Sequence, residues 1–319
     1  MEKNEIKSYE GSLFLKYHKG IVYNIILLKD GRLSSCCSSG KIIIYKKQTF
    51  QIEQIINGEN GFIFHLELSN HNIVAVCNNS LLEIYELNNN KNILSQQIKI
   101  KIQWYKSLCR KVFEIDNNTF ALYLKYGFIN IYKKDNNNKY TKIFEKKIHH
   151  RNNFDHLNTL KINKSIVVST RCNSNSLHFL DIKNQFKNIA TINNIKCSER
   201  KNSLLMINDI ILIVGSRKAN GIYLIDTKNY FVIKHIMQGI AFYSMIKLSN
   251  GNLLVGYKDI NNKSGLTEYK YEEEKLIEIN FVKEEKFILN LCEMKDGNIA
   301  ALSVNNKRIK IFKNIKYNK

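Results

Sequence analysis

The sequence contains no proline, one tryptophan and only seven arginines, against 42 lysines. Together with abundant asparagine, isoleucine, tyrosine and phenylalanine, this composition is typical of an AT-rich coding sequence. No apolar run approaches the roughly 18–20 residues of a membrane helix, so no transmembrane helix is expected. The first twelve residues are charged and hold no apolar segment, which predicts that a secretory signal is absent.

Recognisable catalytic motifs are also missing. The chain has no glycine-rich phosphate loop, no GxSxG elbow and no HExxH helix. Its one histidine cluster, HHRNNFDH at residues 149–156, suggests either metal ligands or a solvent loop. The loop is the preferred interpretation, because adjacent histidines do not converge naturally and Arg151 lies among them. We therefore expect no enzyme activity, no metal and no cofactor.

The cysteines do not form a disulfide pattern. There are seven, an odd number, and none has CxxC spacing: Cys36, Cys37, Cys77, Cys109, Cys172, Cys197 and Cys292. Most fall in segments that are expected to be buried strands. This pattern is typical of reduced, buried thiols, and it predicts a cytoplasmic protein.

What the chain does contain is a repeated unit, which is clearest at residues 21–47. IVYNIILL predicts a buried strand, Lys29-Asp30-Gly31 a hairpin turn, and RLSSCC a second strand. Ser38-Ser39-Gly40 turns again into the β-branched strand KIIIYK. A more polar fourth strand follows, such as QIEQII. One such unit cannot bury both of its faces, so neighbouring copies are needed.

Six further copies follow along the chain. The residues that close the third strand are Tyr45, Tyr85, Tyr132, Leu180, Ile225, Tyr269 and Phe312, at intervals of 40, 47, 48, 45, 44 and 43. A period near 40–45 residues with several strands per repeat is typical of propeller blades. We therefore predict an all-β, seven-bladed β-propeller of four-stranded antiparallel blades.

The predicted boundaries give a single domain. A flexible lead covers 1–11, the propeller covers 12–319, and the blades lie near 18–57, 58–100, 101–149, 150–194, 195–238, 239–283 and 284–314. The seventh unit lacks a fourth strand, and the segment 13–17 stands before the first unit without a partner. We expect this N-terminal strand to complete the last blade and close the ring, which removes exposed sheet edges.

Residues 18–47, HKGIVYNIILLKDGRLSSCCSSGKIIIYKK, resemble one repeat of the WD40 family. His18 stands where that family has its Gly-His histidine, and residues 29–31 look like its first hairpin turn. Tyr45 takes the place of the family's tryptophan. The resemblance covers about 305 residues as architecture. It implies a general role as a scaffold or adaptor. It implies no more specific function, because one fold can host many functions.

The chain departs from that family in its dipeptide motif. No unit carries Trp-Asp, and the aspartate survives only as Asp181 and Asp226. The His–Asp network of WD40 blades is therefore not expected in most of these blades. The acidic run 272–274 and the short asparagine clusters fall between expected strands, and we interpret them as turns.

The net charge of +21 suggests two alternatives. It points to an anionic partner, either nucleic acid or a phosphoinositide membrane surface. It also fits a lysine-rich solvated surface without such a role, because the lysines are spread over all blades with no dense run. We prefer the second interpretation and keep the first as the alternative function.

The arginines indicate a more specific site. In a propeller, the loop that leads into each first strand and the loop between second and third strands lie on the same rim. Four arginines and two adjacent lysines in blades four and five fall in such loops: Arg151, Arg171, Arg200, Lys201, Arg217 and Lys218. Several guanidinium groups together bind carboxylate or phosphate. This predicts docking of an acidic or phosphorylated partner, although charged residues are common in loops anyway.

Aromatic residues extend this predicted site into the third blade. Trp104 and Tyr105 precede its first strand, and Tyr126 lies between its second and third strands. Trp104 is interpreted equally well as an interface anchor or as a cap over the core. The resulting hypothesis is a non-catalytic scaffold that docks a partner protein or peptide on one rim of the propeller.

Overall fold

A computed structural model of the chain describes residues 9–100, 109–124, 127–148, 158–171, 175–196, 203–216, 221–237, 239–304 and 306–314. For residues 9–12, 110 and 171 it describes the backbone alone. The chain forms two compact units. Unit A consists of residues 16–155 and 305–308, and unit B of residues 1–15, 156–304 and 309–319.

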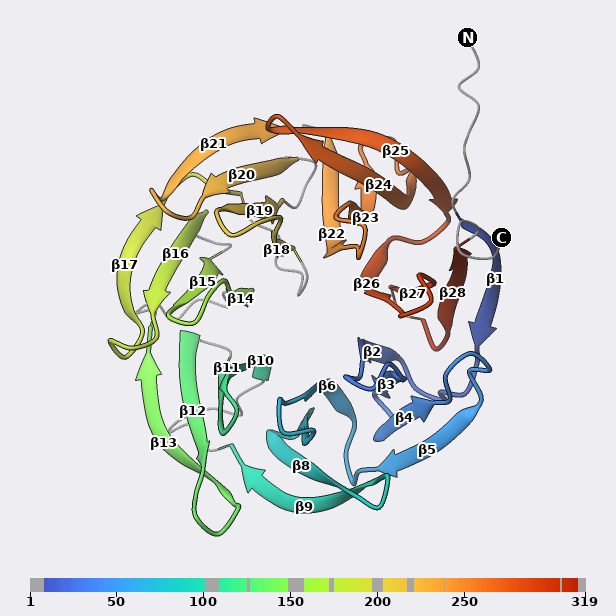
Figure 1. The fold of residues 1–319 in the computed structure, drawn as a ribbon, viewed down its shortest axis with the longest axis vertical. Coiled ribbons are helices and arrows are strands. Elements are labelled where there is room, and N and C mark those ends of the chain that lie inside the picture. Colours follow the sequence, from blue (N-terminus) through green and yellow to red (C-terminus); the bar gives the residue numbers. More distant parts are fainter. Residues whose placement is uncertain are drawn as a thin grey trace. The chain divides into compact units, whose positions relative to one another are not determined.

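Unit A contains the first three blades. Blade 1 is β2 (Val22–Leu27), β3 (Leu33–Cys37), β4 (Lys41–Tyr45) and β5 (Ile52–Asn57); blade 2 is β6 (Phe62–Glu67), β7 (Ile73–Cys77), β8 (Leu81–Asn88) and β9 (Lys91–Lys99); blade 3 is β10 (Cys109–Asp116), β11 (Thr119–Leu124), β12 (Phe128–Lys134) and β13 (Tyr140–Lys147). Each sheet follows the order of the chain. Figure 1 shows β6 between β2 and β10 on the inner side of this unit, with β5, β9 and β13 on its outer side.

Unit B contains the other four blades. Blade 4 is β14 (Thr159–Lys161), β15 (Ile166–Arg171), β16 (Ser176–Asp181) and β17 (Lys187–Ile192); blade 5 is β18 (Leu204–Met206), β19 (Ile211–Gly215), β20 (Ile222–Asp226) and β21 (Phe231–Ile236); blade 6 is β22 (Ile240–Lys247), β23 (Leu253–Asp259), β24 (Ser264–Glu272) and β25 (Lys275–Glu284); blade 7 is β26 (Ile288–Glu293), β27 (Ile299–Ser303), β28 (Ile309–Asn314) and β1 (Tyr9–Leu15).

The fourth strand of blade 7 comes from the N-terminus. β1 pairs antiparallel with β28, and Leu15 lies opposite Ile309 (Figure 1). The expected closing strand is confirmed, although it begins at Tyr9 rather than at residue 13. The predicted all-β fold of seven four-stranded antiparallel blades is likewise confirmed.

The hydrophobic cores lie between neighbouring blades. One core joins Ile42 and Ile44 of blade 1 to Phe62 and Tyr85 of blade 2. Similar cores join blade 2 to 3, 4 to 5, 5 to 6, and 6 to 7. The second strands are buried on both faces, which explains their small or continuously apolar residues such as Cys36. Each blade therefore depends on its neighbours for burial.

A repeated carboxylate also holds neighbouring blades together. Glu67 of blade 2 accepts a hydrogen bond from the backbone N–H of Lys29 in the first turn of blade 1, with 2.5 Å between N and O. Glu114 of blade 3 accepts the N–H and hydroxyl of Ser69 at 2.6 and 2.7 Å. Glu293 of blade 7 binds Ser249 of blade 6 in the same way, at 2.7 and 2.8 Å. These bonds satisfy turn N–H groups that have no partner in their own blade.

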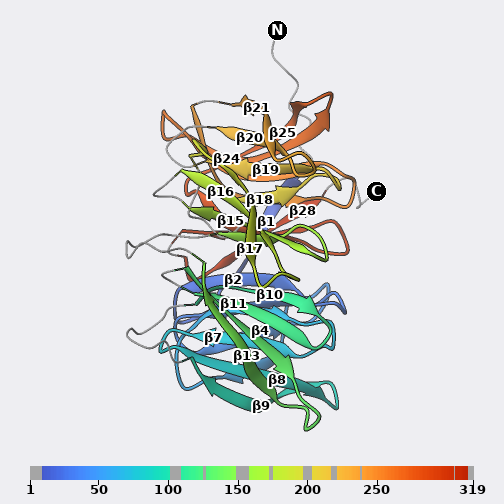
Figure 2. The same cartoon turned by 90° about the vertical axis from the view of Figure 1, so that its left-hand side faces the viewer.

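Every fourth strand carries a bulge opposite the end of the third strand. The extra residues are Gly11, Glu53, Ser95, Ile143, Ile189, Ile233 and Ile279. A bulge interrupts the regular ladder and increases the local twist, so it discourages pairing with another chain. Figure 2 shows β13 running at a steeper angle than β11, as the twist of such a sheet requires.

The turns between third and fourth strands include two that differ only in residue type. In blade 6, Glu273 and Glu274 have φ of 48° and 57° between the paired Glu272 and Lys275. In blade 2, Asn89 and Asn90 occupy the same places with φ of 47° and 62°. Such two-residue turns favour Asn-Gly, because both residues need positive φ. The two glutamates confirm the predicted turn, but they adopt a conformation that is costly for them.

Replacement of these glutamates is therefore expected to stabilise the protein. We predict that Glu273→Asn/Glu274→Gly raises the free energy of unfolding by about 1 kcal/mol, because the left-handed conformation no longer carries a penalty. The measurement is urea denaturation followed by circular dichroism. The matched control Asn89→Glu/Asn90→Glu should lower stability by a similar amount. Equal stability of all three proteins would contradict this account.

Candidate functional site

Strand direction brings two kinds of loop to one edge of each blade. The loop leading into the first strand and the loop between second and third strands form what we call the upper rim. In blade 1 the Ser38 N–H donates to the Ile21 carbonyl at 2.9 Å, and in blade 2 the Asn78 N–H donates to Gly61 at 2.8 Å. The other two turns of each blade form the lower rim.

The first strands of five blades carry a bulge next to the upper rim. The extra residues are Tyr23, Ile63, Arg110, Tyr243 and Leu289. A bulge re-aims a side chain, and such features are common next to binding sites. Tyr23 is 42% exposed, and Ile63, Tyr243 and Leu289 are half-buried. These bulges place Tyr23, Tyr243 and Leu289 next to the upper rim, whereas Ile63 also packs against the core between blades 2 and 3.

One part of the upper rim in unit A combines exposed cations with exposed tyrosines. We call this the blade 1 patch, and it consists of Lys16, Tyr17, Lys19, Tyr23, Lys307 and Arg308. Two contacts bring its segments together. Lys16 and Arg308 are covalently next to Leu15 and Ile309, which are partners across the β1–β28 ladder. In addition, the Val22 N–H donates to the Asn306 carbonyl at 3.0 Å.

The cations of the blade 1 patch are not neutralised. Lys16, Lys19, Lys307 and Arg308 are exposed, and none forms an ion pair within the part of the chain that the structure describes. The unit A loops at residues 16–21, 38–40, 57–61 and 306–308 contain a single carboxylate, Glu59. The loop that leads into β26, whose Phe287 carbonyl accepts the Val304 N–H, adds Glu285. This surface therefore attracts anions.

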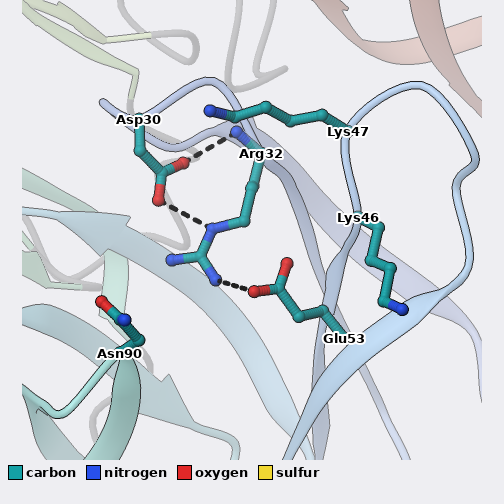
Figure 3. A pocket seen from close by; sticks show the side chains of 6 residues that line it. All are labelled: Asp30, Arg32, Lys46, Lys47, Glu53 and Asn90. Atoms are coloured by element: carbon teal, nitrogen blue, oxygen red, sulfur yellow. Dashed lines mark hydrogen bonds and ion pairs between the residues drawn. The ribbon is translucent and has the colours of Figure 1, made fainter.

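A pocket on the lower rim of blades 1 and 2, in contrast to the blade 1 patch, contains an arginine that is paired with carboxylates. It has a volume of about 450 Å³ and is lined by Asp30, Arg32, Lys46, Lys47, Glu53 and Asn90 (Figure 3). Arg32 donates from Nε to Asp30 at 2.7 Å and from Nη1 to Glu53 at 3.0 Å, and its side chain is 12% exposed. Its charge is thus balanced by two carboxylates. We interpret this arginine as a link between the β2–β3 turn and β5, not as an anion site.

Beneath the blade 1 patch lies a short polar network. His18 Nε2 and the Ser35 hydroxyl are 2.6 Å apart, and the Ser35 and Tyr45 hydroxyls are 3.0 Å apart. Burial, with a smaller contribution from Lys41, lowers the pKa of His18 to about 4. Burial also raises the pKa of Tyr45. These three side chains thus form a His–Ser–Tyr network in blade 1, while His18 Nδ1 has no partner among the described residues.

In other blades the tyrosine that replaces the family's tryptophan has a partner in its own strand. Tyr85 donates its hydroxyl proton to Glu83, two residues before it, and Glu83 is 1% exposed. Tyr132 and Tyr269 bond Asn130 and Thr267 in the same relation. A buried tyrosine hydroxyl needs such a partner, just as the N–H of a buried tryptophan would need an acceptor.

Unit B has its own aromatic surface at the upper rim. The rings of Tyr243 and Phe287 stack with centroids 4.5 Å apart, and Lys258 Nζ lies 5.9 Å from the Phe287 centroid. Nearby, Ile260 is 71% exposed. Because stacked aromatics with an adjacent cation are typical of interface anchors, this surface is a second candidate for partner contact.

The site residues predicted from sequence mostly fall outside the described residues. These are Arg151, Arg200, Lys201, Arg217, Lys218, Trp104, Tyr105 and Tyr126, together with the histidine cluster at 149–156. Only the backbone of Arg171 is described, at the end of β15 opposite Ser176. The crescent across blades three to five therefore stays a prediction.

The blade 1 patch was missed because its two halves are almost 300 residues apart in the sequence. Arg308, one of only seven arginines, was a signal for it, since the expected closing strand leads directly to Lys16. Within the described ranges, no group of three His, Cys, Asp or Glu residues has the geometry to bind a metal. In the same ranges no helix is long and apolar enough to cross a membrane.

Comparison with known proteins supports the fold alone. No protein-family model and no curated protein sequence matches the chain. A chain in the crystal structure of the mitotic checkpoint complex is similar, with a TM-score of 0.76 and 10% identity, over 98% of this chain and 93% of that one. The WD40 β-propeller domain of Doa1 has a TM-score of 0.69 and 14% identity, over 98% of both chains. The chain has the fold of WD40 propellers, as its repeats predicted.

The buried His18 predicts a dependence of stability on pH. Its folded pKa of about 4 lies below the ordinary histidine pKa of 6.5, so the unfolded state binds more protons between these values. Stability is complete above pH 6.5 and falls as the pH drops toward 4, by about 2 kcal/mol between about pH 7 and pH 5. The measurement is urea denaturation across this range.

The variant His18→Gln should show a shallower dependence, because it removes the titrating group. His71→Gln is the matched control, since the side chain of His71 is 54% exposed. If the His18 variant and wild type lose stability in parallel, another group is responsible.

Proposed function

We propose that the protein is a non-catalytic interaction scaffold, which docks a partner protein or peptide across the upper rim. The observation that carries the proposal is the bulge in the first strands, which lies next to that rim and consists of Tyr23, Ile63, Tyr243 and Leu289. A few aromatic and apolar anchors provide most of the binding energy at such interfaces. The WD40-type fold fits this role, since it offers a rigid rim of loops.

The other features of the rim agree with this function. Loops on a rigid sheet scaffold are free to vary without loss of the core, so they suit recognition. The five described cysteines are free thiols, which fits a reducing compartment, and we propose a cytoplasmic location on that basis. The aromatic surface of Tyr243 and Phe287 gives unit B an anchor of its own.

A comparison of two sets of bulge residues tests the proposal. We expect Tyr23→Ser/Ile63→Ser/Tyr243→Ser/Leu289→Ser to lose partners that wild type captures from native extract, because their anchors are gone. The matched control is Ile143→Ser/Ile189→Ser/Ile233→Ser/Ile279→Ser, which changes four bulge residues of outer strands. Circular dichroism confirms that each variant is folded. Identical partners for both variants, or equal loss from both, would contradict docking at the upper rim.

The predicted crescent in blades three to five is tested separately. If its arginines bind an acidic or phosphorylated partner, Arg151→Ala/Arg171→Ala/Arg200→Ala/Arg217→Ala should lose that partner in the same capture experiment. Phosphatase treatment of the extract then distinguishes phosphate from carboxylate. An unchanged set of partners would exclude this crescent while leaving the rest of the upper rim as the docking surface.

A further inference from the structure

We propose that the blade 1 patch binds a short acidic segment of a partner protein, through Lys16, Lys19, Lys307 and Arg308 with Tyr17 and Tyr23 as anchors. The proposal rests on the proposed docking function of the upper rim and names the chemistry of the partner there. It concerns a part of the rim distinct from the arginine crescent of blades three to five.

Closure by the N-terminal strand creates this patch. Because Leu15 and Ile309 are ladder partners, the chain leaves β1 at Lys16 next to the point where it reaches β28 from Arg308. The Val22–Asn306 hydrogen bond holds the loop with Lys307 against the start of β2. Four cations from two ends of the chain are thereby fixed on one surface.

Some basic residues elsewhere in the chain are neutralised by a carboxylate. Arg32, Lys134, Lys142 and Lys310 each pair with a carboxylate. In the blade 1 patch no carboxylate performs this role among the described residues, so the positive charge remains available. An arginine fork binds a carboxylate through two parallel hydrogen bonds, which makes Arg308 the group best suited to fix an acidic side chain.

The extent of the patch favours a protein segment over nucleic acid. Proteins that bind single strands use a basic groove with a series of aromatic platforms. Toward blade 2 the basic surface ends at blade 1, since the upper-rim loops of blade 2, at residues 57–61 and 78–80, contain no lysine or arginine. Tyr17 is 47% exposed with its ring centroid 6.1 Å from that of Tyr45, so it offers a fixed apolar contact beside the cations. A short segment with alternating acidic and apolar residues matches this surface.

Binding of a synthetic peptide tests this inference. The probe is a fluorescein-labelled peptide in which glutamates alternate with leucine and phenylalanine, and its reference has glutamine at every glutamate. We expect Lys16→Gln/Lys307→Gln/Arg308→Gln to lower the affinity for the acidic peptide by at least about tenfold, because three charge-assisted contacts are removed. The matched control Lys46→Gln/Lys47→Gln/Lys91→Gln removes the same charge from the lower rim and should change the affinity less than about twofold.

A second variant distinguishes binding at the blade 1 patch from non-specific electrostatic attraction of the acidic peptide to a basic protein. Tyr17→Ser/Tyr23→Ser keeps the net charge and should still lower the affinity for the acidic peptide by about fivefold, because apolar contact is lost. The proposal is overturned if Lys16→Gln/Lys307→Gln/Arg308→Gln and its lower-rim control weaken peptide binding equally. It is also overturned if the wild-type protein does not bind the acidic peptide. Tighter binding of a single-stranded oligonucleotide or of phosphatidylserine vesicles at the same residues would also overturn it.

The outcome is distinguishable from failure of the proposed function. If native partners are lost from the bulge variant but retained by Lys16→Gln/Lys307→Gln/Arg308→Gln, docking at the upper rim stands and the acidic segment is rejected. If the bulge variant retains them as well, the rim itself is not the docking surface.

Discussion

The structure depends on burial between blades, because one four-stranded sheet has two apolar faces and no way to cover them. The second strands show this most directly: all five residues of β3, β7 and β27 are buried. Each core cluster takes its residues from two adjacent blades. The carboxylates of Glu67, Glu114 and Glu293 supplement this burial at the lower rim, where they satisfy turn N–H groups of the preceding blade. The lower rim thus contributes directly to holding neighbouring blades together.

The fold forms without a Trp-Asp dipeptide in any repeat, because other groups form hydrogen bonds near the ends of the third strands. Where tyrosine replaces tryptophan, its hydroxyl finds a partner within the blade, such as Ser35 for Tyr45 or Glu83 for Tyr85. The aspartates that survive serve the following turn. Asp226, for example, accepts the N–H groups of Lys228 and Asn229, and these bonds lower its pKa. These blades therefore differ in sequence, while the buried tyrosine hydroxyls of Tyr45 and Tyr85 each have a hydrogen-bond partner.

The fold was predictable from the sequence because its signals are local and repeated. The Lys29-Asp30-Gly31 turn has Gly31 at φ 96° and recurs at Gly297 with φ 75°, so a period of turns and strands identifies blades without the family motif. The candidate site was less predictable. Residue types indicate which loops are charged, but not which charges are already balanced. Arg32 and Arg308 look alike in sequence, yet only Arg32 lies between two carboxylates. That difference depends on side-chain packing, which the spacing of the repeats in the sequence does not reveal.

Closure of the last blade links architecture to recognition. A strand from the N-terminus completes blade 7, so the segment that follows it must pass the loop before β28 on its way to blade 1. Exposed cations there cost little stability, since water solvates them and no core depends on them. A patch of lysine and arginine beside exposed tyrosines therefore reduces folding stability little at this position. The same charged residues placed in a core between blades would disrupt the fold.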